Sequence, residues 1–413
     1  MPMRKRRLLQ LLAIVGPGLI AANAGNDAGG IATYSQAGAD HGYRLLWAML
    51  LITYGVAIVQ EMCARMGAVT GKGLADLIRE NFGVRWSLVA MLAFIICNGL
   101  TTVADFAGVG AALELFGISR YLSVPVIAFI LWCLVVRGTF TVVERAFIAM
   151  SLVFLGYIAS AFLAGPNWGE VMRATVRPHI EYSGGYLWML VGLIGTTISP
   201  YMQLFVQSAV AEKGIKMEEY PMERLDVYLG SVFACTIAMF IIIATGTVLH
   251  PHGIQVNTAE EAAAALGPLA GSYAEAIFGI GLFGASMLAC GVLPLATAYA
   301  VSEAFGFERG ISRSFEEAPV FTALFTLLLA GGAAATLIPG VNPFRLMVFS
   351  QVVQGILLPI ILVFILLLVN DRELMGPYTN SRLFNFAAWT TTIVVSALSL
   401  LLLGVTVVNA IGG

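Results

Sequence analysis

The chain carries very little charge. Only 11% of its 413 residues are charged, whereas 59% are hydrophobic and the mean hydropathy is +0.88. A soluble domain usually has about a quarter charged residues, so this scarcity excludes a water-soluble fold. The net charge is −2, and there is no basic stripe with interleaved aromatic residues, so a nucleic-acid partner is excluded as well.

Motifs for redox, nucleotide or hydrolytic chemistry are also missing. The cysteines are odd in number and all lie in apolar runs, so no disulfide framework or CxxC metal site is predicted: Cys63, Cys97, Cys133, Cys235 and Cys290. The chain has no GxxxxGK[ST] loop and no cluster of Ser, His and Asp in a soluble loop. An enzyme and an ATP-driven pump are therefore disfavoured, and no cofactor is expected.

Long apolar runs dominate what is present. Runs of roughly 17–25 residues are the length needed to cross the hydrocarbon core of a bilayer. They recur at 8–38, 44–68, 86–113, 121–137, 141–164, 185–211, 227–249, 272–304, 318–338, 344–369 and 384–410. We therefore predict an all-α integral membrane protein of about eleven transmembrane helices, which forms one domain (1–413) in contact with the lipid bilayer.

The positions of Lys and Arg predict the orientation of these spans. Positive residues in short loops are retained on the cytoplasmic side. One set of loops holds most of them, whereas the opposite loops hold Arg44, Arg120, Arg173, Arg177 and Arg345. This bias predicts a multi-pass protein of the cell (plasma) membrane, with its N-terminus in the cytoplasm and its C-terminus outside.

Two of the spans are interrupted in the middle. The first has a Gly-rich break at 25–30, and the sixth has Pro200 beside Gly195, Thr196 and Ser199. Non-helical backbone at this depth is tolerated only where it is buried or lines a cavity. Breaks five helices apart match a LeuT-type five-plus-five inverted repeat, whose broken helices hold the substrate at the midplane. We predict repeats at 8–164 and 185–369, with an additional helix at 384–410.

Acidic and amide side chains within the spans are candidate ligands. Asp27 lies in the first break, where a buried charge costs about 2.5–3.5 kcal/mol on insertion scales, so we predict a cation site there rather than a simple kink. Asp105 in the third span either bonds Thr101 or Thr102 one turn earlier, or relays a proton or ion. Gln351 either links helices or faces the site.

Several separated motifs then resemble the Nramp family of divalent metal transporters over nearly the whole chain. The matching stretches are Gly16-Pro17, Asp27-Ala28-Gly29-Gly30, Gln36-Ala37-Gly38, Gly42-Tyr43-Arg44-Leu45-Leu46-Trp47, Gln60-Glu61, Ala64-Arg65, Thr70-Gly71-Lys72-Gly73-Leu74-Ala75, Ser350-Gln351-Val352 and Leu358-Pro359. Their common order makes the resemblance far more specific than any single motif.

The resemblance implies a set of metal contacts in the two breaks. They are the Asp27 carboxylate, the position of Gly30, backbone carbonyls near Ala24 and Thr196, the Ser199 side chain and, in one state, Gln351. The sequence departs from the family pattern at four places. Ala28 replaces the proline of the break, Gly30 its asparagine ligand, Ser199-Pro200-Tyr201 a Met-Pro-His motif, and Gly108 an acid of the third span.

These departures favour a hard cation, because oxygen ligands suit Mg²⁺ whereas a thioether favours softer metals. The pattern resembles the Nramp-related magnesium transporters. We predict a secondary transporter that imports divalent cations by alternating access, with Mg²⁺ as first candidate and Mn²⁺ as second. A proton-coupled Mn²⁺/Fe²⁺ importer is the alternative, if Met202 or Gln203 takes the place of the missing methionine. An amino-acid or amine transporter on the same fold is more remote.

Proton coupling is not expected. The four histidines, His41, His179, His250 and His252, are predicted in outer loops or at outer helix ends. Histidine is the side chain whose charge changes near neutral pH. Only Asp27 and Asp105 would remain to carry protons within the membrane.

Overall fold

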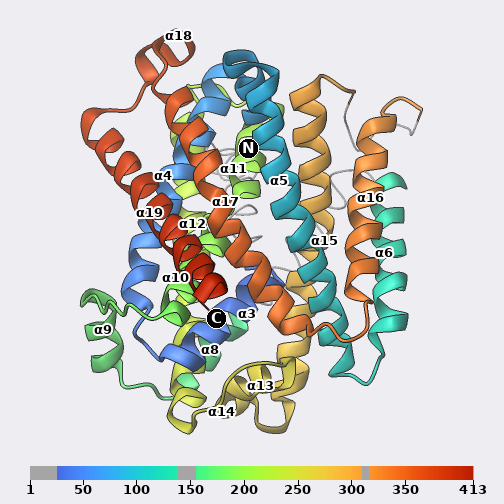
Figure 1. Cartoon of the computed structure of the whole chain (residues 1–413), viewed down its shortest axis with the longest axis vertical. Coiled ribbons are helices and arrows are strands. Elements are labelled where there is room, and N and C mark those ends of the chain that lie inside the picture. The colour runs from blue at the N-terminus through green and yellow to red at the C-terminus, as the bar shows by residue number, and fades with distance from the viewer. Residues whose placement is uncertain (1–25, 138–154, 309–315, 413) are drawn as a thin grey trace, which may run out of the picture.

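A computed structural model describes residues 26–137, 155–308 and 316–412, and its regular elements in these ranges are all helices (Figure 1). The α-helices are α3 (Ala28–His41), α4 (Leu46–Thr70), α5 (Leu74–Glu114), α6 (Arg120–Arg137), α8 (Leu155–Leu163), α9 (Trp168–Val176), α10 (Gly184–Thr197), α11 (Pro200–Glu212), α12 (Tyr220–Val248), α13 (Ala259–Ala263), α14 (Gly267–Ala270), α15 (Ala274–Phe305), α16 (Pro319–Thr336), α17 (Pro343–Val369), α18 (Arg372–Met375) and α19 (Arg382–Gly412).

Most of the predicted spans correspond to helices. Within the described residues, eight helical segments are long and apolar enough to cross a bilayer, with α10 and α11 counted as one, and a shorter apolar helix covers Arg120–Val136. The predicted spans 8–38 and 141–164 lie partly outside the described residues. Only their second halves are described, as α3 and α8.

The predicted start of the third span, at residue 86, is wrong. Helix α5 begins twelve residues earlier, at Leu74, and continues to Glu114 across a kink at Gly83, whose φ is +79°. Glycine adopts this positive φ without steric cost. The first turns of α5 contain Arg79 and Glu80. Because these residues are charged, a hydropathy pattern does not detect this part of the helix.

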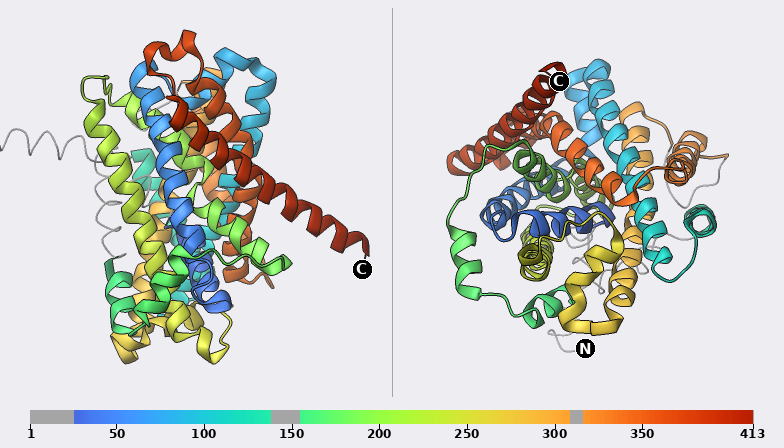
Figure 2. Two further views of the ribbon diagram at one scale, coloured as in Figure 1. Left: turned by 90° about the vertical axis from the view of Figure 1, so that its left-hand side faces the viewer. Right: turned by 60° about the horizontal axis from the view of Figure 1, so that its bottom comes forward.

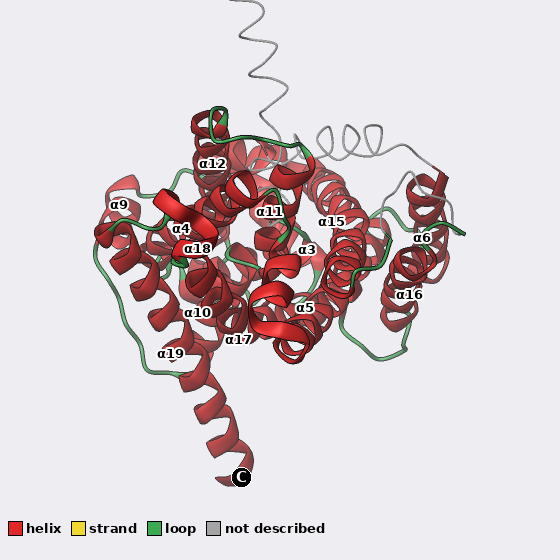
Figure 3. Ribbon diagram, turned by 90° about the horizontal axis from the view of Figure 1, so that it is seen from above, coloured by secondary structure: helices red, strands yellow, loops and turns green. Residues whose placement is uncertain are grey.

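Helix α3 lies at the centre of the bundle. It contacts α5, α10, α12, α15 and α17, so long helices enclose it on several sides. Helices α6 and α16 pack together at one flank (Figures 1 and 3). Helix α19 crosses the outside of the bundle obliquely, and its C-terminal end projects away from the rest (Figure 2).

The outer surface of the long helices is apolar. Leu92 on α5, Phe129 on α6, Leu327 on α16 and Leu383 on α19 are each more than half exposed. Large apolar patches are unusual on a soluble monomer. This surface therefore fits the hydrocarbon of a bilayer.

Glycines bring the backbones of α10 and α17 together. A Cβ atom at Gly195 would overlap the carbonyl oxygen of Gln351, and one at Gly355 would overlap the carbonyl of Val191. Small residues allow membrane helices to approach this closely. The contact fixes Gln351 beside the end of α10, where the sixth span breaks.

We expect Gly195→Val to destabilise the protein by about 1–3 kcal/mol, because overpacking a close contact costs roughly that much. The thermal midpoint of the purified protein in detergent should fall. Gly185→Val is the matched control, since this glycine also lies on α10 but has open space where a Cβ would stand. Equal midpoints for the two variants would show that the α10–α17 contact tolerates a side chain.

Candidate functional site

Helix α3 starts within the stretch where the sequence predicts the first break, and its N-terminus is capped by Asp27. Its backbone is extended (φ −68°, ψ −177°), and its Oδ1 accepts a hydrogen bond from the Gly30 N–H. The Asn26 amide donates to the carbonyl of Ala234 on α12 at 3.3 Å. A carboxylate at a helix N-terminus satisfies unpaired N–H groups and is favoured by the helix dipole. The hydrogen bond from Gly30 therefore holds the Asp27 carboxylate in a fixed position at the start of α3.

Asp105 reaches the same turn from α5. Its Oδ1 accepts a hydrogen bond from the Ala28 N–H at 3.1 Å. Of the two alternatives for Asp105, the bond to a threonine one turn earlier is not present, because Thr101 and Thr102 donate to the carbonyls of Cys97 and Asn98 on their own helix. The two buried carboxylates thus share the first turn of α3.

The amide of Gln351 completes this cluster from α17. Its Nε2 lies 3.5 Å from both carboxylate oxygens of Asp27, and its Oε1 accepts from Gln354 Nε2 at 2.8 Å. Gln354 also donates to Thr101 on α5 at 2.9 Å. A Cβ at position 29 would overlap the Gln351 amide, so Gly29 is what permits the approach. Gln351 therefore links helices and also faces Asp27.

The second break separates α10 from α11 at the predicted place. Helix α10 ends at Thr197 and α11 begins at Pro200, whose ring has no N–H to continue the helix. The Ser199 side chain caps nothing, and its Oγ is buried without a partner. The Tyr34 hydroxyl lies 3.0 Å from Thr197 Oγ1. This contact ties the two broken spans together.

The predicted site residues fall into two connected groups. Asp27, Gly30, Asp105 and Gln351 share the hydrogen-bond cluster at the start of α3, where Gly30 contributes its N–H. Thr196 and Ser199 are buried in the second break. Ala24 lies outside the described residues.

The first group holds two buried acids without a basic partner among the described residues. Asp27 is 2% exposed and Asp105 0%, and neither has a Lys or Arg partner within the described part of the chain. Burying an unpaired charge is costly, and two like charges add repulsion. One oxygen of Asp105, Oδ2, has no hydrogen-bond partner. The arrangement is suited to a bound cation that supplies the missing positive charge.

The atoms of this cluster that could ligate a metal are the carboxylate oxygens, which accept hydrogen bonds from the Ala28 and Gly30 N–H groups. Over the described ranges, no group of three or more His, Cys, Asp or Glu residues could hold a metal ion. The Met202 thioether lies 3.7 Å from Gln60 Nε2, which places it against α4. The two breaks therefore offer the carboxylate oxygens of Asp27 and Asp105 and the unpartnered Ser199 hydroxyl rather than a set of sulfur and histidine ligands.

Three departures from the family pattern were named from the sequence without being placed next to this cluster: Ala28, Gly108 and Tyr201. A Cβ at Gly108 would overlap the Ala28 methyl group and the Ser286 hydroxyl, so these two departures from the family pattern contact each other. Tyr201 is buried close enough to both carboxylates for their charge to act on its hydroxyl. The sequence marked Ala28, Gly108 and Tyr201 as departures, but it contained no signal for their proximity.

A cavity of about 500 Å³ lies at the far end of α3. Gln36 and Asp40, one helical turn apart, line it together with Gln255 and Asn257. Val348, one turn before Gln351 on α17, forms part of its wall. The cavity is thus placed along the two helices that lead to Asp27.

Comparison with known proteins gives consistent matches. The family model described as natural resistance-associated macrophage protein-like matches residues 18–404. The divalent metal cation transporter MntH of Verminephrobacter eiseniae is 29% identical over 396 residues, covering 91% of this chain and 85% of the relative. MntH of Bacillus subtilis is 25% identical, and the match covers 95% of this chain and 92% of the relative.

Solved structures agree with the fold. A manganese transporter mutant from Eremococcus coleocola has a TM-score of 0.75 at 20% identity, over 97% of this chain and 88% of that one. MhsT in complex with L-phenylalanine has a TM-score of 0.61 at 15% identity, and the match covers 94% of this chain and 97% of that one. These likenesses confirm the predicted all-α LeuT-type fold. The relatives are named as transporters, which confirms the expectation of a transport protein rather than an enzyme.

Proposed function

This chain belongs to the Nramp family, and from that membership together with the site we propose that it imports a divalent metal cation across the cell membrane. The observation that carries the proposal is the pair of buried carboxylates, Asp27 and Asp105, on one helix turn without a cationic side chain among the described residues. The names of the curated relatives support the same substrate class.

Transport would proceed by alternating access around the two breaks. The positive-inside bias supports a cytoplasmic N-terminus and an external C-terminus, which puts the cavity beside Asp40 on the outer side. A cation with six waters needs about 180 Å³ at about 30 Å³ per water, so the cavity has room for a hydrated ion. The repeats at 8–164 and 185–369 stay a prediction.

The donor set favours Mg²⁺. Oxygen ligands suit this hard ion, which keeps several waters and needs few protein ligands. Ser199 supplies a hydroxyl where the family pattern has a thioether, and Gly30 leaves the space of a missing amide side chain. Mn²⁺ remains the second candidate, because a manganese transporter shares the fold and curated relatives transport divalent metals.

The test of the function is Asp27→Asn. Asparagine is a good N-cap, so the variant retains an oxygen for the Gly30 N–H and loses only the charge. We expect loss of metal binding and of uptake into proteoliposomes, with an unchanged elution profile in detergent. Asp27→Ala should behave in the same way.

The matched control is Glu223→Gln, which removes a buried acid in the first turn of α12, outside the site. This variant should retain uptake. Wild-type transport by Asp27→Asn would rule out the proposed site.

Replacing Ser199 with methionine tests the metal preference. A thioether is a soft ligand, so the variant should bind Mn²⁺ or Cd²⁺ severalfold more tightly relative to Mg²⁺. Isothermal titration with the three ions measures the ratio. Ser199→Ala is the control, since it removes the hydroxyl without adding sulfur. If all affinities move together, or not at all, the side chain at position 199 does not contact the metal.

We expect uptake that is not stoichiometrically coupled to protons. The four histidines lie at the last residue of α3, between α9 and α10, and in the 3₁₀ turn after α12 (His250–His252). Liposomes loaded with a pH dye and given an inward metal gradient should therefore show no protein-dependent acidification. Acidification that needs metal and disappears in Asp105→Asn would instead favour the proton-coupled Mn²⁺/Fe²⁺ importer.

A further inference from the structure

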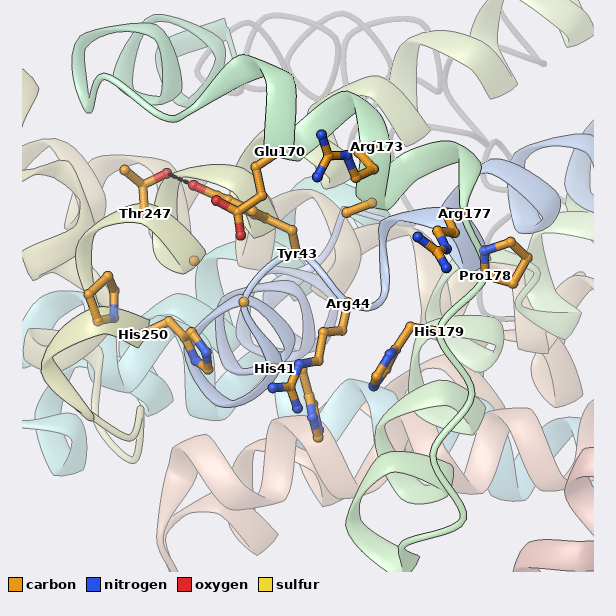
Figure 4. A pocket seen from close by; sticks show the side chains of 14 residues that line it. His41, Tyr43, Arg44, Glu170, Arg173, Arg177, Pro178, His179, Thr247 and His250 are labelled. Atoms are coloured by element: carbon orange, nitrogen blue, oxygen red, sulfur yellow. Dashed lines mark hydrogen bonds between the residues drawn. The ribbon is translucent and has the colours of Figure 1, made fainter.

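A second cavity, of about 740 Å³, lies between the C-terminal ends of α3 and α12 and the short helix α9 (Figure 4). Its lining includes His41, Arg44, Arg173, Arg177, His179 and His250. We propose that this cavity binds the phosphate headgroup of an anionic lipid in the outer leaflet. The proposal concerns a site away from Asp27 and does not depend on which ion the protein carries.

The charge of the lining selects an anion. Three arginines line the cavity, whereas Glu170 is its single carboxylate. Arg173 lies on α9, and Arg177 lies one turn later, at the C-cap of this helix. Neither forms an ion pair in the part of the chain that is described. Arg44 lies 3.7 Å from Glu181 in an exposed pair, which contributes little. Guanidinium groups form bidentate hydrogen bonds with phosphate oxygens.

The position of α9 favours a lipid over a soluble anion. One side of this helix presents Trp168, Met172 and Val176, four residues apart and 39%, 62% and 68% exposed. The other side presents Glu170, Arg173 and Arg177 to the cavity. A helix with this division lies in the plane of a membrane interface. Phosphate headgroups lie at the depth of that interface, directly beside the arginines.

The walls of the cavity are held in place by contacts that need no ligand. The His179 carbonyl accepts hydrogen bonds from Trp47 Nε1, at 3.0 Å, and from the Tyr186 hydroxyl. His250 Nδ1 lies 2.8 Å from the carbonyl oxygen of Ala39 on α3. These bonds pin the segment after α9 to α4 and α10, and pin the end of α12 to α3. The site is therefore largely preformed.

A headgroup in this cavity would bridge three elements. It would contact the end of α3, whose other end carries Asp27 about 21 Å away at 1.5 Å per residue. It would also contact α9 and the turn after α12. The lipid would therefore clamp the outer end of the half-helix that holds the site.

The test measures binding of short-chain phosphatidylglycerol to the full-length protein in a neutral detergent. Short-chain phosphatidylcholine is the zwitterionic comparison, and inorganic phosphate is the soluble one. We expect phosphatidylglycerol to bind at least tenfold more tightly than phosphatidylcholine. The double variant R173Q/R177Q should lose this preference. R85Q/R382Q, which removes two exposed arginines outside the cavity, should retain it.

The outcomes separate the possible sources of the anion. Competition by millimolar phosphate against phosphatidylglycerol, lost in R173Q/R177Q, would support recognition of the phosphate group. Equal binding of the two lipids by the wild type, or a preference that survives in R173Q/R177Q, would overturn the proposal. Saturable phosphate binding without a lipid preference would assign the cavity to a soluble anion and overturn the lipid assignment.

Discussion

Two carboxylates held at one helix end, without a counter-charge in the described structure, are the constraint around which the protein is organised. The first turn of α3 offers N–H groups to Asp27 and Asp105, and this stabilises both acids in position. Hydrogen bonds alone do not offset the repulsion of two buried like charges. A proton on one of the two acids removes this repulsion, and so does a bound cation, which is the state that the proposed function requires.

Close packing of small residues makes this convergence possible. Gly29 admits the amide of Gln351, Gly108 admits Ala28, and the pair Gly195 and Gly355 brings α10 against α17. Each glycine lies where a β-carbon would overlap a neighbouring helix. Side chains from three sequence-distant helices can then meet at one turn. Other buried acids, such as Glu61 and Glu303, lie on other helices, so the pair at the start of α3 is distinguished by its shared helix turn.

The sequence predicted those parts that depend on local chemistry. The break between α10 and α11 and the start of α3 followed from Pro and Gly, whose effects on the backbone are local. Asp27 was singled out because a charge in a membrane span is costly. The partner of Asp105 could not be predicted, because the Ala28 N–H is 77 positions away along the chain. The contact of Gly108 with Ala28 depends on helix packing in the same way. The start of α5 was missed because a polar helix end has no hydropathic signal.

The position of the Gln351 amide has a consequence for the empty carrier. Its nitrogen, which carries a partial positive charge, faces both oxygens of Asp27 at 3.5 Å. If Asp27 binds the ion as proposed, this amide dipole would partly replace the ion's charge after release. The unloaded protein could then change conformation with the Asp27 carboxylate still facing a hydrogen-bond donor. A carrier that returns empty moves its cargo in one net direction, whereas one that cannot must trade one ion for another.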